Sequence, residues 1–172
     1  MKPKLTFLLL VAFVVPARAQ TAIDSSAVTE TEQAVRQKLQ TDGIHVVHFW
    51  APWCDNSLAE LRSGWYDLIE KNPDVDFTFV TIWNNGETGV GMLRQYAIPD
   101  RVTVLAQPDT GPSADDANRR HTFLGRPLTW TPSTWIFRNG TLAFSLNYGE
   151  TPMSTLQRLI DAAQTDWGAD GN

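Results

Sequence analysis

The junction between the first apolar strand and the helix after it constrains the fold of this chain most. Residues 45–50 form an apolar run broken by two histidines, as expected of a buried central strand. A turn, Ala51-Pro52-Trp53, follows, and Cys54 stands where an amphipathic helix begins. Unpaired N–H groups and the helix dipole favour negative charge at such a position. The junction therefore predicts an α/β domain that displays Cys54 as a reactive thiol.

Cys54 is the only cysteine in the chain. A dithiol enzyme would carry a second sulfur three residues later, but Ser57 stands there. One cysteine cannot form an internal disulfide, so Cys54 is a working thiol, an intermolecular pairing site or an inert side chain.

The first residues have the pattern of a secretory signal. Lys2 and Lys4 precede an apolar run over 5–15, and Ala17-Arg18-Ala19 ends the segment. We predict a signal peptide over 1–19 and one exported domain over 20–172, located in the periplasm. The alternative is an uncleaved anchor, although the run is shorter than the roughly 20 apolar residues of a membrane span.

The charge of the predicted mature domain argues against some partners. Three of the 14 basic residues lie in the signal, so 11 remain against 19 acidic residues, a net charge of −8. Such acidity disfavours nucleic acid and anionic membrane surfaces as partners. The remaining length suffices for one domain with its own core.

Hydrophobic spacing predicts an alternating order of elements. We expect helices over 24–40, 55–71, 88–97, 113–124 and 152–164. We expect strands over 44–50, 75–83 and 101–105, and a hairpin over 133–147 that turns at Asn139-Gly140. This order predicts a three-layer α/β domain with a parallel core and an antiparallel hairpin at its edge.

Two motifs carry a resemblance to the thioredoxin-like superfamily. The segment Phe49-Trp50-Ala51-Pro52-Trp53-Cys54-x-x-Ser57 resembles the thioredoxin motif F-W-A-x-W-C-x-x-C, with its last cysteine replaced. Residues 131–140, Thr-Pro-Ser-Thr-Trp-Ile-Phe-Arg-Asn-Gly, resemble the second motif, T-P-T-x-x-x-F-x-x-G. The long spacing between the motifs, with an insertion at about 88–124, and the predicted export are most similar to the periplasmic TlpA/ResA-type branch. The resemblance covers about 44–165 and implies a thioredoxin fold.

The resemblance also implies a site. Pro132 would be a cis proline against Cys54, Thr131 would offer backbone groups to a substrate, and Trp53 would lie exposed beside the thiol. His48 takes the strand position where thioredoxins hold a buried acidic residue. No cofactor is implied.

The residues around Cys54 predict its chemistry. The helix start, and a hydrogen bond from Ser57 to the sulfur, would favour the thiolate, whereas Asp55 opposes it; we expect the helix start to prevail. Since Ser57 cannot resolve a mixed disulfide, we predict monothiol exchange or isomerisation with cysteine-containing protein clients or small thiols. His48 is either a buried neutral imidazole or a proton relay beneath Cys54 and Ser57.

Other classes of function remain as alternatives. The main one is a redox-inactive binding module, favoured by the unusual pair Asp55-Asn56. A metal site would need Cys54 with His48 or His121, and we predict none because a second cysteine is absent. A peroxiredoxin would carry Thr or Ser at the position of Ala51, iron–sulfur monothiol glutaredoxins are intracellular, and no hydrolase triad motif is present. We expect a monomer, because pairing through Cys54 would block the site.

Overall fold

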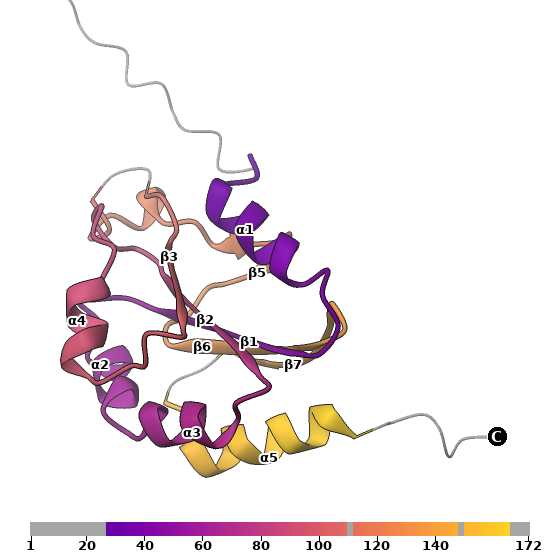
Figure 1. Ribbon diagram of the computed structural model, residues 1–172. Helices are drawn as coiled ribbons and strands as arrows, with labels where there is room; N and C mark the ends of the chain where they lie inside the picture. The colour runs from indigo at the N-terminus through magenta and orange to yellow at the C-terminus, as the bar shows by residue number, and fades with distance from the viewer. Residues whose placement is uncertain (1–26, 110–111, 148–149, 166–172) are drawn as a thin grey trace, which may run out of the picture.

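The computed structural model describes residues 27–109, 112–147 and 150–165 (Figure 1). The predicted signal peptide over 1–19 lies outside these residues. A five-stranded sheet in the order β3-β2-β1-β6-β7 forms the centre of the molecule. Its strands are β1 (Ile44–Trp50), β2 (Asp76–Thr81), β3 (Thr103–Ala106), β6 (Ser133–Arg138) and β7 (Thr141–Leu146).

The strand pairing confirms the predicted mixed sheet. β1 pairs in parallel with β2, and β2 pairs in parallel with β3. On its other side β1 pairs antiparallel with β6, which forms the predicted hairpin with β7 at the sheet edge. Every residue of β1 is buried, as its apolar sequence predicts.

Helices cover both faces of the sheet, so the domain has three layers (Figure 1). α1 (Glu30–Lys38) covers one face with a core around Phe49, Phe123 and Trp135. The other face packs against α2 (Asp55–Leu61), α3 (Trp65–Lys71), α4 (Val90–Gln95) and α5 (Met153–Gln164). Trp50 is fully buried on this second face.

The predicted helices over 24–40 and 55–71 are both longer than the real ones. Residues 24–26 lie outside the described part, and α1 begins at Glu30 because Thr29 and Glu32 form a capping box. The second helix is broken at Gly64, whose φ of +114° is left-handed and incompatible with a continuous helix. α2 and α3 are therefore separate short helices.

The helix predicted over 113–124 is wrong. This segment contains a short 3-10 helix (Asp116–Asn118) and a small hairpin of β4 (Thr122–Phe123) and β5 (Arg126–Pro127). The Asp115 side chain accepts a hydrogen bond from the backbone N–H of Ala117. This backbone N–H therefore has a partner within the short turn itself, without a longer helix. Leu124 and Gly125 have positive φ, so the chain turns where the predicted helix would end.

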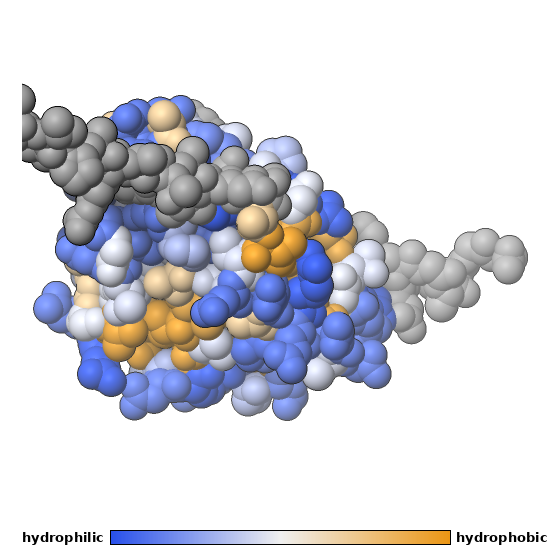
Figure 2. Space-filling view, turned by 90° about the horizontal axis from the view of Figure 1, so that it is seen from above, coloured by the Kyte–Doolittle hydropathy of each residue, from blue (hydrophilic) through white to orange (hydrophobic). Residues whose placement is uncertain are grey.

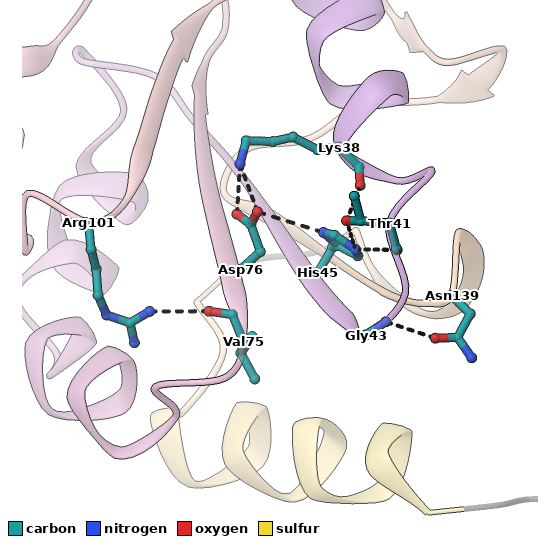
Figure 3. A network of polar contacts seen from close by, with 8 residues as sticks. All are labelled: Lys38, Thr41, Gly43, His45, Val75, Asp76, Arg101 and Asn139. Atoms are coloured by element: carbon teal, nitrogen blue, oxygen red, sulfur yellow. Dashed lines mark hydrogen bonds and ion pairs between the residues drawn. The ribbon is translucent and has the colours of Figure 1, made fainter.

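A polar network ties the sheet together at the end remote from Cys54 (Figure 3). The Lys38 ammonium lies 2.7 Å from one carboxylate oxygen of Asp76, and the His45 ring lies 4.0 Å from the same oxygen. The Asn139 side chain accepts a hydrogen bond from the N–H of Gly43 at 2.8 Å. These contacts join α1, β1, β2 and the hairpin turn. Cys54 lies beyond the opposite end of β1.

One face of the molecule carries both hydrophilic and apolar side chains (Figure 2). Figure 2 shows one face, on which apolar areas lie between larger hydrophilic ones. None of the described helices combines the length and apolar character that a membrane span requires. Trp53 and Trp130 are among the large side chains left exposed, at 45% and 44% of their area.

Candidate active site

Cys54 occupies the N-cap position of α2, directly after β1 and its turn. Its backbone carbonyl accepts the first helical hydrogen bond, from the N–H of Leu58 at 3.0 Å. The side chain is partly exposed. Its thiol donates a hydrogen bond to the carbonyl oxygen of Thr131 at 3.4 Å. The turn after β1 therefore displays the sulfur at the surface, as the sequence predicts.

The segment Thr131-Pro132 lies against Cys54 although it is remote in sequence. It immediately precedes β6, which pairs with β1 and so returns to the same end of the sheet. The peptide bond between Thr131 and Pro132 is cis, and both residues are buried. The sheet topology thus brings the two sequence motifs together at one place.

Ser57 is fully buried and joins α2 to the same segment. Its hydroxyl lies 2.9 Å from the Thr131 hydroxyl and accepts a hydrogen bond from the Ala51 N–H at 3.3 Å. The predicted partner of this hydroxyl was the Cys54 sulfur; its hydrogen bonds among the described residues run to Thr131 and Ala51 instead. Ser57 therefore fixes the geometry around Cys54.

An aromatic cavity opens beside the sulfur. It encloses about 230 Å³ and is lined by Trp53, Cys54, Asn56, Trp83, Arg119, Thr129, Trp130 and Thr131. The indole N–H of Trp53 donates to the Trp83 carbonyl at 2.6 Å. The exposed position of Trp53 beside the thiol agrees with the prediction. Trp83 and Arg119 were not predicted, because they reach the cavity from segments that carry no motif.

Solved structures with the same architecture come from thiol–disulfide proteins. A secreted Mycobacterium tuberculosis disulfide oxidoreductase, homologous to Escherichia coli DsbE, has 20% identity and a TM-score of 0.51, covering 73% of this chain and 85% of its own. A putative thiol:disulfide interchange protein DsbE from Chlorobium tepidum has 20% identity and a TM-score of 0.50, covering 74% and 83%. The chain has a thioredoxin fold. A thioredoxin family protein from Chlorobium tepidum TLS adds a third match, with 14% identity, a TM-score of 0.51 and coverage of 74% and 83%.

The thioredoxin fold confirms the architecture that the two motifs predict. Neither a protein-family model nor a curated protein sequence matches the chain. At 20% identity or less, these structural matches establish the fold alone.

His48 lies in the core beneath this thioredoxin-fold site. It is fully buried, and its Nδ1 lies 3.0 Å from the Thr134 hydroxyl and 3.6 Å from one carboxyl oxygen of Glu60. Burial lowers the pKa of His48 to about 3, so the imidazole is neutral at physiological pH. Its polar contacts among the described residues do not include Cys54 or Ser57. A relay through His48 stays a prediction.

Glu60 is a buried acid that the sequence analysis missed. Its side chain is 1% exposed and accepts a hydrogen bond from the Thr151 N–H at 2.8 Å. Burial, with a smaller contribution from the charge of Glu150, raises the pKa of Glu60 to about 7 despite this hydrogen bond. Glu60 lies three residues after Ser57, so the two side chains share one face of the helix. This spacing is the sequence signal that could have indicated a buried Glu60.

The histidines of the metal alternative have other partners. His48 is enclosed in the core with Thr134 and Glu60. His121 lies 3.3 Å from a carboxylate oxygen of Asp116 and packs against the Trp83 ring. Across residues 27–109, 112–147 and 150–165, no three His, Cys, Asp or Glu side chains gather as a metal site would require.

Proposed function

We propose that this chain is an exported thioredoxin-like protein of thiol–disulfide exchange, with Cys54 as its single nucleophile. The observation that carries the proposal is the placement of the sulfur. It is partly exposed at the start of α2, faces the Thr131-Pro132 segment, and opens into an aromatic cavity. The thioredoxin fold of disulfide oxidoreductases supports the same chemistry.

The reaction is a single exchange step. The Cys54 thiolate attacks one sulfur of a client disulfide, and a new S–S bond joins Cys54 to the client. The client's old S–S bond breaks, and the leaving sulfur takes the electron pair and then a proton from solvent. The Ser57 hydroxyl is no competent replacement for a resolving thiolate. Release therefore needs a second thiol from the client or a small thiol, which suits isomerisation or assisted reduction.

Thr131 gives the mixed disulfide a recognition element. In the free protein its carbonyl accepts the thiol hydrogen of Cys54. That hydrogen is lost when the mixed disulfide forms, so the carbonyl becomes available to a backbone N–H of the bound partner. An extended cysteine-containing client would then lie along Thr131 and Pro132, with Trp53 as an apolar wall.

The setting of this activity follows from the sequence. The signal over 1–19 would direct the domain over 20–172 to the periplasm, where disulfides persist. We propose that it works there as a monomer without a cofactor, on cysteine-containing proteins or small thiols.

Intact-mass spectrometry tests the proposal. Residues 20–172 are incubated at neutral pH with a short peptide disulfide, with Cys54→Ser as the control. We expect one adduct, absent from the control and stable until a thiol is added. A native protein that forms no adduct, while the unfolded protein does, would contradict the proposal.

A redox-inactive binding module is the second candidate, and one observation favours it. The hydrogen bond from the Cys54 thiol to Thr131 exists only in the protonated form of the sulfur. A binding module predicts partner capture that survives Cys54→Ala, whereas the exchange function predicts that this substitution abolishes capture.

A further inference from the structure

Arg119 places a fixed positive charge in the cavity beside Cys54. Its guanidinium carbon lies 5.1 Å from the ring centre of Trp53 and 5.2 Å from that of Trp83. Its Nε donates a hydrogen bond to the Ser113 carbonyl at 2.7 Å. The side chain keeps 23% of its area exposed. Two aromatic contacts and a backbone hydrogen bond therefore hold the cation in place without removing it from solvent.

The rest of the cavity lining has no charge that neutralises Arg119. Its polar members are Asn56, Thr129 and Thr131, besides Cys54 itself, and the others are tryptophans. Arg119 forms an ion pair with Asp116, which lies outside this lining. Its carboxylate is 75% exposed and lies 3.5 Å from the Arg119 guanidinium, longer than a close ion pair. The whole protein has a net charge of −5, so its composition does not predict a positive charge beside the nucleophile. The position of Arg119 is therefore a local feature of the fold.

We propose that this cavity selects small disulfides and thiols that carry a carboxylate, with Arg119 binding the carboxylate while Cys54 reacts with the sulfur. This inference rests on the proposed function and names its substrate class. The cavity of about 230 Å³ is below the roughly 300–1,000 Å³ typical of drug-sized ligands, so a compact thiol fits it best. The Trp53 and Trp130 rings would cover the apolar part of such a ligand.

The exchange step balances without another reactant. The Cys54 thiolate displaces one half of a symmetric disulfide and forms a mixed disulfide with the other half. The displaced half leaves as a thiolate and takes a proton from solvent. Arg119 takes no part in bond making; it positions the retained half by its carboxylate and raises its local concentration.

Asp116 competes with the incoming carboxylate for the same guanidinium. Because Asp116 is exposed and its ion pair is long, a ligand able to bind Arg119 at close range can displace it. Removing the Asp116 charge should therefore strengthen the preference for anionic ligands. Removing the Arg119 charge should weaken the same preference.

Three symmetric disulfides of different charge test the proposal: anionic 3,3′-dithiodipropionate, neutral bis(2-hydroxyethyl) disulfide and cationic cystamine. The rate constant of mixed-disulfide formation at Cys54 is measured for each disulfide. It is divided by the rate constant for the reaction of the same disulfide with a neutral free thiol, which removes differences in the intrinsic reactivity of the three disulfides. The readout is the ratio of the anionic to the neutral disulfide. It is compared among wild type, Arg119→Gln and Arg126→Gln, which removes the same charge from an exposed site on β5.

We expect Arg119→Gln to lower this ratio on the order of tenfold, the size of one charge-assisted contact. Arg119→Lys should retain part of the preference, and Asp116→Asn should raise it. Arg126→Gln should shift the ratio far less. Equal ratios in the Arg119→Gln and Arg126→Gln proteins would overturn the inference and leave the exchange function standing. A wild-type protein that reacts with none of the three disulfides would overturn both.

Discussion

Glu60 should make the stability of this protein fall as the pH rises through neutrality. Burial raises the pKa of Glu60 from 4.5 to about 7, so the folded state keeps a proton that the unfolded state has lost. The stabilisation is complete below pH 4.5 and is lost as the pH rises through about 7. The isosteric Glu60→Gln keeps a neutral side chain that can accept the Thr151 hydrogen bond, and it cannot titrate.

The size of the effect follows from the linkage relation. One pKa unit corresponds to about 1.4 kcal/mol, so the full shift is worth about 3 kcal/mol. Between pH 6 and pH 8 the wild type should lose about 1.4 kcal/mol relative to Glu60→Gln. His48 contributes with the opposite sign, because burial lowers its pKa and its contribution to stability grows as the pH rises. That contribution cancels in the difference between the two proteins.

Urea unfolding at intervals from pH 5.5 to pH 8.5 measures this difference. The free energies of unfolding of wild type and Glu60→Gln should diverge steadily across neutral pH, with the variant becoming relatively more stable. A difference that stays constant over this range would refute the reasoning, since it would mean that Glu60 does not titrate there in the folded protein.

Four further substitutions test other parts of the account. Ser57→Cys should supply a resolving thiol, so that the mixed disulfide collapses to an internal disulfide at least about 10²-fold faster by mass spectrometry; an adduct of unchanged lifetime would contradict this. His48→Leu should leave the alkylation rate of the nucleophile near the wild-type value, because the described polar contacts of His48 do not include the sulfur; a loss on the order of 10²-fold would instead establish the predicted relay. Gly89→Ala should cost about 3 kcal/mol in urea unfolding, because Gly89 has a φ of +72° and an added Cβ would lie 2.4 Å from the Trp50 ring. Gly125→Ala, at a φ of +73° with open space around it, should cost only the backbone part, about 1 kcal/mol; equal costs would exclude the clash.

The sequence predicts the sheet well because its signals are local. The apolar run of β1 and the Asn139-Gly140 turn each fix an element without help from the rest of the chain. The two motifs then place Cys54 and Thr131 at the same end of β1. This is why the thiol and the proline segment lie at one end of the sheet, whereas the Ser57 hydroxyl bonds to Thr131 and Ala51 in place of the predicted sulfur.

The missed features depend on contacts between distant segments. Gly64 breaks a helix whose apolar spacing continues across it, and spacing alone does not report a left-handed φ. Glu60 lies outside the apolar spacing that predicts its helix, and its carboxyl contacts Thr151 and His48, which are distant from it in sequence. Arg119 becomes part of the site only because the segment predicted as a helix turns beside Trp83 instead.

The central claim is that the start of α2 makes Cys54 a working nucleophile. The most direct test is the rate of iodoacetamide alkylation of residues 20–172 at neutral pH, measured for the folded and the urea-unfolded protein, with Cys54→Ser as the control. The account predicts that the folded protein is modified at Cys54 faster than the unfolded protein. A folded protein that is modified no faster than the unfolded one would contradict the account and favour the binding module.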